Sequence, residues 1–585
     1  MSRTGYSRRA ALAGVAGGVA ATSGCLGEVR NLVGRQRSQQ ISLSIATLPT
    51  DNDPYALEIA TELADHMTDA GLDVGINPMD PEVLLRDILI NHEFNIYIAP
   101  YPGEGDPDLL RSLLHSTYGE EGGWQNPFGF SSLTLNDLLD EQRTVDGTQR
   151  EEIVGEIQEF IVREQPFTVV AFPDVIAANR SDRFVGWPRG GIQDPMAFLQ
   201  LERVSSDATE LTLLTRDRRI TTNLNPIAAE YRDRGDVTGL LYEPLVRGPN
   251  RDIPWLARDV SWSDSGGLSA TVTLRETSWH DDETISAHDI DFTYRFLADT
   301  SLGEMETPVP TPWRRGRISL VDAVSVVDDR VVTIAFSTNV QAVAERALTV
   351  PILPKHIWEE KSSQADLAGI DIIGGTTEAL VWPNDEPIGS GPLRFVESTA
   401  DEQLVLERFE DHFLDAETEG VPDRLRAELP FDRVVFNVVP SHDAAVDVLD
   451  SGDADGTLGG LREGVVPRIA RTDDVDLSVA SGDAFYHVGY NCRQSPLTDP
   501  QFRRAIAKLL HRESLVENVF GGYAVPAESP LEGSPWILPE LQWDGESQLE
   551  FPGTDGTLDV DRARENFREA GYHYDGDRLV SRGDS

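Results

Sequence analysis

Apolar residues along the chain occur in short runs separated by polar turns, and several of these runs predict regular elements. Leu211 to Leu214 predicts a strand, and Leu109 to His115 predicts a helix. Near the C-terminal end, Asp575-Gly576-Asp577 and Arg582-Gly583-Asp584 predict turns around a short strand from Arg578 to Ser581. With 585 residues and 40% hydrophobic content, the chain can bury a large core and form several domain-sized units.

The N-terminal residues have the composition of an export signal. Ser7-Arg8-Arg9 precedes the apolar, small-residue stretch Ala10 to Ala21. This stretch is too short to span a bilayer, but it has the length of the apolar region of a signal peptide. We therefore expect residues 1–24 to be a Tat-type signal peptide, which would export an already folded protein.

A lipid anchor is expected directly after this signal. Thr22-Ser23-Gly24-Cys25 resembles a lipobox, although Leu or Val is usual where Thr22 stands. Lipidation of Cys25 would make residues 25–40, which are polar and Arg-rich, a flexible tether. The alternative is a signal peptide with an incidental cysteine. The other cysteine, Cys492, then has no intrachain partner and is expected to be a small core residue.

The charge is strongly acidic and spread over the whole chain. The formal net charge is -49, and Lys occurs only at positions 355, 361 and 508 among the 50 basic residues. Few lysines and a dispersed acidic surface predict a halophile, in which high salt screens the self-repulsion. Nucleic acid is not an expected partner, because phosphate binding needs basic patches.

Several long motifs carry a resemblance to a known family. ATVTLRETSWHDDETISAHDIDFTYRFLAD begins at Ala270, and PIGSGPLRFVE and HVGYNCRQSPLTDPQFRRAIAKLLHRESLVENVFGGYAVPAESPL follow it. Upstream stands ITTNLNPIAAEYRDRGDVTGLLYEPLV. These stretches resemble, in family order, the family 5 extracellular solute-binding proteins, the dipeptide and oligopeptide binders of ABC importers.

The order of the two halves, however, is swapped. Segments that resemble the opening of the family begin near Thr209, whereas residues 41–205 resemble its closing segments. A circular permutant would have its new joint at Ser205-Ser206-Asp207 and its new cut between Ser585 and Ile41, at a hairpin edge. The rival interpretation is a fusion or truncation that left two partial copies. A permutant requires Ile41 to Ile45 to pair in one sheet with strands from residues 486–585.

The resemblance implies an α/β fold: two lobes of the type II periplasmic-binding-protein kind with a small insert domain, circularly permuted. Lobe two would comprise residues 41–180 and 486–585, with 181–243 and 384–485 in lobe one and 244–383 as the insert domain.

Catalytic motifs are missing from the sequence. It contains no G-x-x-x-x-G-K-S/T, G-x-S-x-G or H-E-x-x-H. Trp279-His280-Asp281-Asp282 with His288 has the residue types of a metal cluster, but the matching family segment is a turn between a strand and a helix. We therefore expect no enzyme activity, no catalytic residue, no metal and no cofactor.

Binding residues are expected on loops that face a cleft between the lobes. Asn223 and Asn225 follow the strand from Leu211 to Leu214 and should face that cleft. Ser390 lies between Gly389 and Gly391, whose lack of a side chain permits either a turn or close approach of a ligand. Tyr490 and Asn491 lie where the chain recrosses into lobe two, so hinge and cleft roles both remain open.

The loop from Ala99 to Asp108 contributes the candidates Tyr101, Glu104 and Asp106. It resembles the family's G-W-x-x-D-x-x-D-P-D loop, in which the first Asp holds a peptide's α-ammonium. In this sequence that Asp falls on Gly103, and the family Trp falls on Pro100. Glu104 is one residue further and could reach the same place. Asp106 is expected to cap the following helix or to fix the loop.

The resulting hypothesis is a lipid-anchored solute-binding protein on the extracellular face of the cell membrane. It would capture a di- or oligopeptide and deliver it to an ABC permease with its ATPase, as a monomer that contacts the membrane through its lipid alone. Two alternatives remain: a non-peptide ligand such as an oligosaccharide or a metal chelate, and a signalling or assembly protein without transport.

Overall fold

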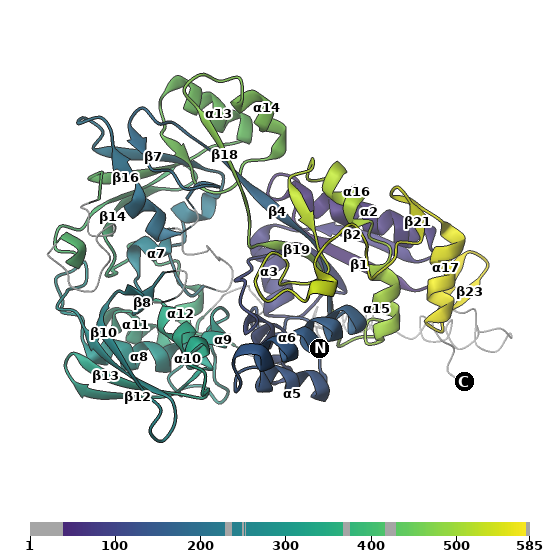
Figure 1. The fold of residues 1–585 in the computed structure, drawn as a ribbon, viewed down its shortest axis with the longest axis horizontal. Helices are drawn as coiled ribbons and strands as arrows, with labels where there is room; N and C mark the ends of the chain where they lie inside the picture. The colour runs from purple at the N-terminus through teal and green to yellow at the C-terminus, as the bar shows by residue number, and fades with distance from the viewer. Residues whose placement is uncertain are drawn as a thin grey trace, which may run out of the picture.

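One long β-sheet path joins the two sides of the molecule in the computed structural model (Figure 1). The structure describes residues 39–192, 194–228, 237–248, 251, 253–366, 375–415 and 429–580. The strand order is β14-β15-β16-β7-β17-β4-β19-β3-β1-β2, and β18 and β20 also pair with β4. We call the part with β1, β2, β3, β19 and β20 the β1 side, and the part with β7 and β14 to β18 the β7 side.

The strands of the β1 side are β1 (Ser42–Thr47), β2 (Asp73–Pro78), β3 (Ile96–Tyr101), β19 (Phe485–Tyr490) and β20 (Ala524–Pro526). Those of the β7 side are β7 (Glu210–Thr215), β14 (Leu393–Thr399), β15 (Gln403–Arg408), β16 (Arg433–Val438), β17 (Gly456–Thr457) and β18 (Asp476–Ser481).

Strand β4 (Phe167–Asn179) passes from one side to the other. Its first part pairs with β19 and β20, and its last part pairs with β18 and β17. A second crossing runs antiparallel to it, because β18 and β19 follow each other in sequence and both pair with β4. Two neighbouring crossing strands therefore connect the sides.

Strand β1 lies in one sheet with strands from the C-terminal part of the chain. It is parallel to β2 and β3, β3 is antiparallel to β19, and β19 and β20 both pair with β4. Just before β1, Gln40 forms an antiparallel bridge with Val580. The Ile41 amide donates to the Leu579 carbonyl at 2.9 Å. Strand β1 therefore shares its sheet with β19 and β20, while its direct strand neighbours are β2 and β3.

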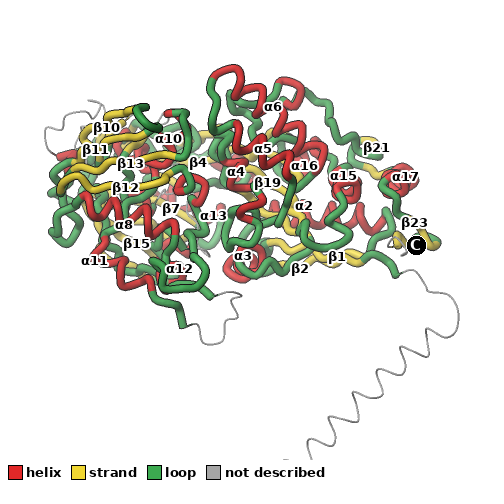
Figure 2. Tube along the Cα trace, turned by 90° about the horizontal axis from the view of Figure 1, so that it is seen from below, coloured by secondary structure: helices red, strands yellow, loops and turns green. Residues whose placement is uncertain are grey.

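Helices cover both faces of the sheet on the β1 side. Alternating strand residues form two separate cores, since successive side chains of a strand point to opposite faces. One core includes α2 (Pro54–Asp69), which contacts β1 and β2 (Figure 2), with α15 (Pro500–Ala507), α16 (Arg512–Asn518) and α17 (Val560–Glu569). The other includes α3 (Pro81–Leu89), α4 (Leu109–Leu114), α5 (Leu133–Glu141) and α6 (Gly147–Glu164).

The β7 side shares a continuous core with a separate four-stranded sheet. That sheet has the order β10-β11-β13-β12, and α8 (Ala287–Ala298) packs against β12 and β13. Its strands are β10 (Ala257–Ser263), β11 (Ser269–Leu274), β12 (Val321–Asp328) and β13 (Val331–Phe336). Short strand pairs occur at β5–β6 (Phe184–Val185, Glu202–Arg203), β8–β9 (Val246–Arg247, Ile253–Pro254), β21–β22 (Gly553–Thr554, Thr557–Leu558) and β23–β24 (His573–Asp575, Arg578–Val580).

The remaining α-helices are α7 (Thr238–Leu241), α9 (Arg315–Ile318), α10 (Gln341–Ala344), α11 (Lys355–Trp358), α12 (Glu378–Val381), α13 (His442–Ser451) and α14 (Val466–Ile469). Two 3-10 helices are η2 (Pro195–Gln200) and η4 (Glu345–Thr349).

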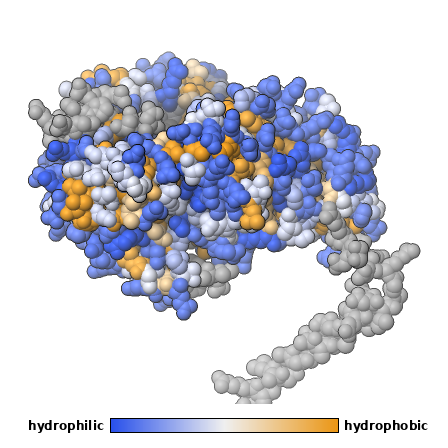
Figure 3. Space-filling model, turned by 60° about the horizontal axis from the view of Figure 1, so that its bottom comes forward, coloured by the Kyte–Doolittle hydropathy of each residue, from blue (hydrophilic) through white to orange (hydrophobic). Residues whose placement is uncertain are grey.

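The predicted mixed α/β class is confirmed, and the predicted elements occur at the expected places. The strand at Leu211–Leu214 is β7, the helix from Leu109 is α4, and the strand from Arg578 is β24. The surface in Figure 3 is mostly hydrophilic, with small separate hydrophobic patches. Within the described ranges, no helix combines the length and apolar character that a bilayer crossing requires.

Candidate functional site

A cleft of about 420 Å³ lies between the two sides of the molecule. The loops that follow β1 and β7 meet there, next to the crossing strands. Ligands of α/β proteins commonly bind where the ends of neighbouring strands diverge. Side chains from both sides and from both crossing strands therefore contribute to its wall. The lining residues are Asn52–Tyr55, Pro173–Ile176, Thr215–Asp217, Ile220, Val237, His442, Leu458–Arg462, Gly482, Ala484, Tyr486 and Tyr523.

Strand β4 opens to solvent where it passes this cleft. Ten of its 13 residues are buried, and the half-buried ones are Pro173, Asp174 and Val175. Burial raises the pKa of the Asp174 carboxyl. Among the described residues, no hydrogen bond or ion pair engages that carboxylate. A partly desolvated, unpaired carboxylate thus faces the hollow.

Arg216 directly follows β7 and reaches across the cleft. Its Nη2 donates to the Asp51 carbonyl of the β1 side at 2.6 Å, and its Nη1 donates to His442 Nε2 at 2.9 Å. Burial lowers the pKa of His442 to about 4, with help from the positive charges of Arg216 and Arg462. His442 is therefore neutral at pH 7 and accepts a bond from Arg216 without neutralising its charge.

The other charged groups of the cleft have partners. Asp53 caps α2 through the Ala56 amide and accepts bonds from the Tyr486 hydroxyl at 2.9 and 3.0 Å. Arg462 stacks on the Tyr55 ring at 4.7 Å and lies 3.6 Å from Glu463. Asp217 is held at two oxygens by an arginine, Arg219, at 2.8 and 3.0 Å.

Glycines widen the cleft at one wall. A Cβ added at Gly460 would meet no atom within 4 Å, and the same holds for Gly459. Gly482 differs, because a Cβ there would lie 2.7 Å from the Pro173 carbonyl oxygen. Open space, rather than close packing, therefore surrounds Gly459 and Gly460.

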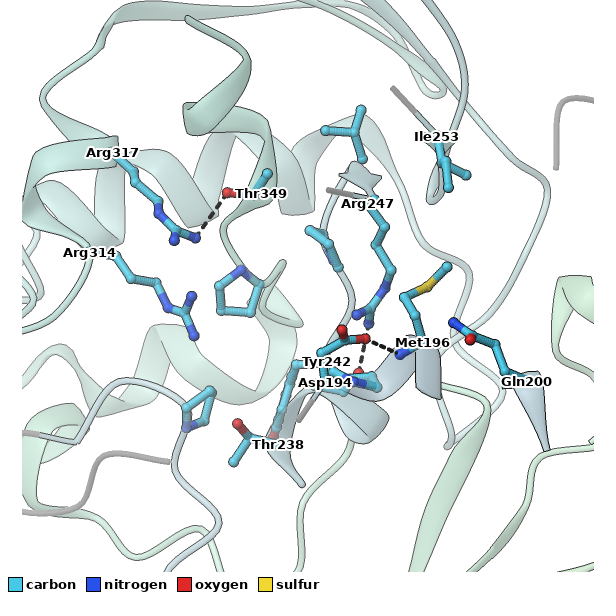
Figure 4. Close-up of a pocket in the computed structure, with 17 residues that line it drawn as sticks. Asp194, Met196, Gln200, Thr238, Tyr242, Arg247, Ile253, Arg314, Arg317 and Thr349 are labelled. Carbon is cyan, nitrogen blue, oxygen red and sulfur yellow. Dashed lines mark hydrogen bonds between the residues drawn. The ribbon is translucent and has the colours of Figure 1, made fainter. Parts of the chain in front are cut away.

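A second hollow, of about 490 Å³, lies beside η2, α7 and α9 (Figure 4). Arg247 lies there beside Asp194 and Tyr242, and Arg317 donates to the Thr349 hydroxyl at 2.9 Å. Its described lining residues all fall between Asp194 and Pro351, so the β1 side contributes none of them. Relative movement of the two sides would act on the 420 Å³ cleft more directly than on this hollow.

The loop after β3 uses its predicted ligand residues in ion pairs. Glu104 pairs with Arg346 and, at 3.0 Å, with Arg317. Asp106 accepts from the Asp108 amide at 2.9 Å and pairs with Arg251 at 2.8 Å. The expectation that Asp106 fixes the loop is thus met, whereas Asp108 occupies the N-cap position of α4.

Tyr101 and Gly103 of the same loop are packed against protein. The Tyr101 ring is buried against Trp124 and Phe485, with centroids 5.3 and 5.4 Å away. A Cβ at Gly103 would lie 1.9 Å from the Asp483 carbonyl oxygen. The position where the family places its ammonium-binding Asp therefore has no room for a side chain.

Asn223 and Asn225 hold their own loop together. The Asn223 side chain accepts from the Asn225 amide at 3.0 Å. The Asn225 amide group donates to the carbonyls of Ala379 and Trp382, both at 2.7 Å. These bonds give Asn225 a structural role in the β7 side.

The Gly389-Ser390-Gly391 segment packs on α7. A Cβ at Gly389 would lie 1.9 Å from the Leu241 carbonyl oxygen, and one at Gly391 equally close to that of Leu240. Close packing of the backbone on α7 therefore accounts for both glycines, and it differs from the turn and the ligand approach expected from the sequence. Ser390 is fully buried.

Tyr490 and Asn491 are also buried in the protein. The Tyr490 hydroxyl lies 2.8 Å from the Thr168 hydroxyl, and Asn491 donates to the carbonyls of His92 and Phe94 at 3.0 and 2.9 Å. The chain crosses between the sides at residues 482–484, before this pair. None of the eight predicted contact residues lines the 420 Å³ cleft, and ligand contact by them stays a prediction.

Sequence reasoning missed Asp174, Arg216 and Gly460. Asp174 had a readable signal, because it is a lone charge in the apolar run from Phe167 to Ala178. Cys25 and residues 1–24 lie outside the described residues. Elsewhere, within the described ranges, no group of three or more His, Cys, Asp or Glu could hold a metal ion. His280 instead contacts the backbone of Gly389 and Gly391.

Known proteins resemble this chain over part of its length. A putative ABC transporter peptide-binding protein of Brucella ovis is 24% identical over 312 residues, 52% of each chain. The oligopeptide-binding protein AppA of Bacillus subtilis is 24% identical over 343 residues, 58% of this chain and 55% of AppA. The AppA structure in complex with a nonapeptide has a TM-score of 0.43 at 20% identity, covering 64% of this chain and 65% of that one.

The chain spans about half the length of the curated relatives that it matches. The model of the bacterial extracellular solute-binding proteins, family 5 Middle, matches residues 253–582, which is more than half of the chain. On this match, the protein belongs to the family 5 extracellular solute-binding proteins, a family of binding proteins rather than enzymes.

Proposed function

We propose that the protein is the substrate-binding lipoprotein of an ABC importer and captures an extracellular solute, a short peptide, in the 420 Å³ cleft. The observation that carries this proposal is the composition of the cleft wall, to which both sides and both crossing strands contribute. A solute that bonds both sides stabilises the closed arrangement, and hinge motion between lobes then couples binding to delivery. The relatives described as peptide-binding favour a peptide.

Within this proposal, Cys25 carries the lipid and residues 25–40 are the tether, after removal of a Tat-type signal peptide. The protein would then lie on the extracellular face of the membrane of a halophile and act as a monomer with a permease and its ATPase. The dispersed charge of -49 supports the halophilic part of this hypothesis.

We also propose that the two halves of the fold stand in swapped order along the chain. Two observations support this: the family match begins at residue 253, and β1 shares its sheet with β19. The bridge from Gln40 to Val580 lies where the cut would separate neighbouring strands. The tether would consequently enter the β1 side, because it precedes β1 directly.

The non-peptide alternative has its own support. Gly103 replaces the family's ammonium-binding Asp and has no space for a side chain, and Glu104 already pairs with Arg317 and Arg346. That loop therefore provides no reason to prefer a peptide over an oligosaccharide or a metal chelate. A solute screen has to include all three classes.

The test fills the cleft without disturbing the protein. Gly460→Leu places a side chain where a Cβ meets no atom within 4 Å, and Gly75→Leu is the matched control at an open, exposed site on β2. Thermal unfolding in high salt is measured with pools of di- and tripeptides, oligosaccharides and metal chelates. A ligand at 100 times its Kd adds about 2.7 kcal/mol to stability.

We expect a pool to stabilise the wild type and Gly75→Leu, and Gly460→Leu to bind at least tenfold more weakly. Binding that is equal in all three proteins would place the ligand elsewhere. A wild type that responds to no pool would contradict transport.

A further inference from the structure

Two oppositely charged side chains of the cleft form no ion pair with a described residue. They are Arg216, at the end of β7, and Asp174, at the middle of β4. One belongs to the β7 side and the other to a crossing strand. Their charges are opposite, so a single ligand could satisfy both.

The guanidinium of Arg216 is positioned but not neutralised. Its described bonds go to a carbonyl oxygen and to a neutral imidazole, and no carboxylate of the described residues pairs with it. Arg219, three residues along, is bonded at two nitrogens to Asp217. Because the fold pairs the neighbouring arginine and leaves this one, Arg216 has donors for a ligand anion, and arginine binds carboxylates most strongly when two N–H groups converge.

Charges of both signs act on Arg216. The carboxylate of Asp51 acts on it most strongly, whereas Arg218 and Arg462, of which Arg462 lines the same cleft, add positive potential. His442 is the first residue of the ten-residue helix α13, whose N-terminal end carries partial positive charge. Asp443 in the first turn and Asp447 offset this, but Arg468 is paired with both. An anionic group next to Arg216 is therefore favoured.

Asp174 has the opposite character. Its backbone is fixed, since the amide donates to the Tyr523 carbonyl at 2.9 Å and the residue pairs with Ser481. The side chain is without a described partner, although the cleft's other acids are engaged: Asp53 by Tyr486 and Asp217 by Arg219. An unpaired, half-buried carboxylate is costly, and a cationic group of a ligand would remove this cost.

We propose that the cleft selects a zwitterionic solute, whose carboxylate bonds Arg216 and whose ammonium bonds Asp174. This inference rests on the proposed function, because it assumes that the cleft is the solute site. It moves the ammonium site from the loop at Gly103 to the crossing strand β4. It also gives the ligand contacts on a lobe and on the connection between lobes, as closure requires.

The experiment compares one peptide pool in three forms: free, N-acetylated and C-terminally amidated. Affinities are measured in high salt by calorimetry for the wild type, Asp174→Asn and Arg216→Gln. The matched controls are Asp182→Asn and Arg394→Gln, which remove the same charges from exposed ion pairs outside the cleft. Circular dichroism confirms that each variant is folded.

Each variant is expected to lose discrimination at one end of the peptide only. The wild type and both controls bind the free pool about tenfold or more tightly than either capped pool. Asp174→Asn loses only the discrimination against acetylation, and Arg216→Gln loses only the discrimination against amidation. If either residue had only a structural role, its replacement would weaken the binding of all three pools equally, and that outcome would overturn the inference.

Failure of the inference is distinguishable from failure of the proposed function. If the wild type binds all three pools equally, and Gly460→Leu abolishes this binding, the cleft is the solute site but is not selective for a zwitterion. If only an oligosaccharide pool binds in a manner sensitive to Gly460→Leu, the inference is again overturned and solute capture stands. If no pool binds, both are overturned.

Discussion

Replacing Asp108 by Asn should destabilise the protein far more than removing an exposed carboxylate nearby. The Asp108 side chain is fully buried and bonds Arg143 Nη2 at 2.8 Å and Arg346 Nη1 at 2.7 Å. Both arginines are themselves buried, with 7% and 4% of their side chains exposed. The amide cannot neutralise them, so the variant keeps two buried cations with less compensation.

The size of the effect follows from this burial. Removing one partner of a buried, hydrogen-bonded ion pair costs about 3–5 kcal/mol. The control Asp140→Asn removes a carboxylate that is 55% exposed and pairs with Arg111, and it should cost about 0–1 kcal/mol. Arg346 belongs to η4 and Asp108 to the loop before α4. The loss of stability therefore includes a weaker contact between the β1 side and the segment around η4.

Urea unfolding at pH 7 and constant salt measures both variants, together with Arg346→Met and the double variant. The Asp108→Asn and Arg346→Met effects should be non-additive, because the residues share one network. If the free energies of unfolding of Asp108→Asn and Asp140→Asn agree within about 1 kcal/mol, the buried network does not stabilise the protein more than an exposed ion pair does.

The same carboxyl has a pH signature with a definite sign. Burial alone would raise its pKa, but Arg143 and Arg346 hold it well below the usual range. A carboxyl whose pKa is lower in the folded state stabilises that state at pH values above its unfolded-state pKa of about 3.9. This stabilisation is lost as the pH falls below that value. The wild type should therefore lose stability more steeply than Asp108→Asn below pH 4.

Two further predictions concern packing and a buried histidine. Gly103→Ala should destabilise the protein by about 1–3 kcal/mol, because its Cβ would lie 1.9 Å from the Asp483 carbonyl oxygen, whereas Gly75→Ala meets no atom within 4 Å. Equal thermal midpoints would contradict the close approach. Burial lowers the pKa of His487 to about 3. Below about pH 6.5 the unfolded chain therefore binds more protons than the folded chain does, and the free energy of unfolding decreases as the pH falls. His487→Gln should flatten this decline by up to about 3 kcal/mol at pH 4 in urea unfolding; an unchanged slope would exclude the histidine as its source.

Local patterns predicted elements well because they depend on neighbouring residues. The apolar run at Leu211–Leu214 became β7, and the run from Leu109 became α4, each with boundaries shifted by one residue. Family motifs placed the turn at Trp279-His280, where the Trp279 amide bonds the Glu283 carbonyl. These features need no information about distant parts of the chain.

The candidate site was harder to predict, since the use of a polar side chain depends on its distant partners. Glu104 was a reasonable ligand candidate in sequence, but Arg317 and Arg346 occupy its oxygens. Asn225 was another, and its donors are bonded to Ala379 and Trp382. Nothing in a local pattern reveals such pairings, because they arise when separate elements pack together.

Residues that contact a ligand consequently have to be identified from the partners that each polar side chain has within the protein, and not from residue type alone. Charged side chains that line the cleft are in part already engaged by the protein, as Asp53 is by the Tyr486 hydroxyl and Asp217 by Arg219. Only groups that remain unpaired can bond a ligand without first breaking a bond within the protein. In the cleft, Asp174 has no described hydrogen bond or ion pair at its carboxylate and Arg216 has no described ion pair, whereas Glu104 and Asp106 are held in ion pairs. In the proposed binding mode, the ammonium group of a peptide would be held by Asp174 on β4 rather than at Gly103.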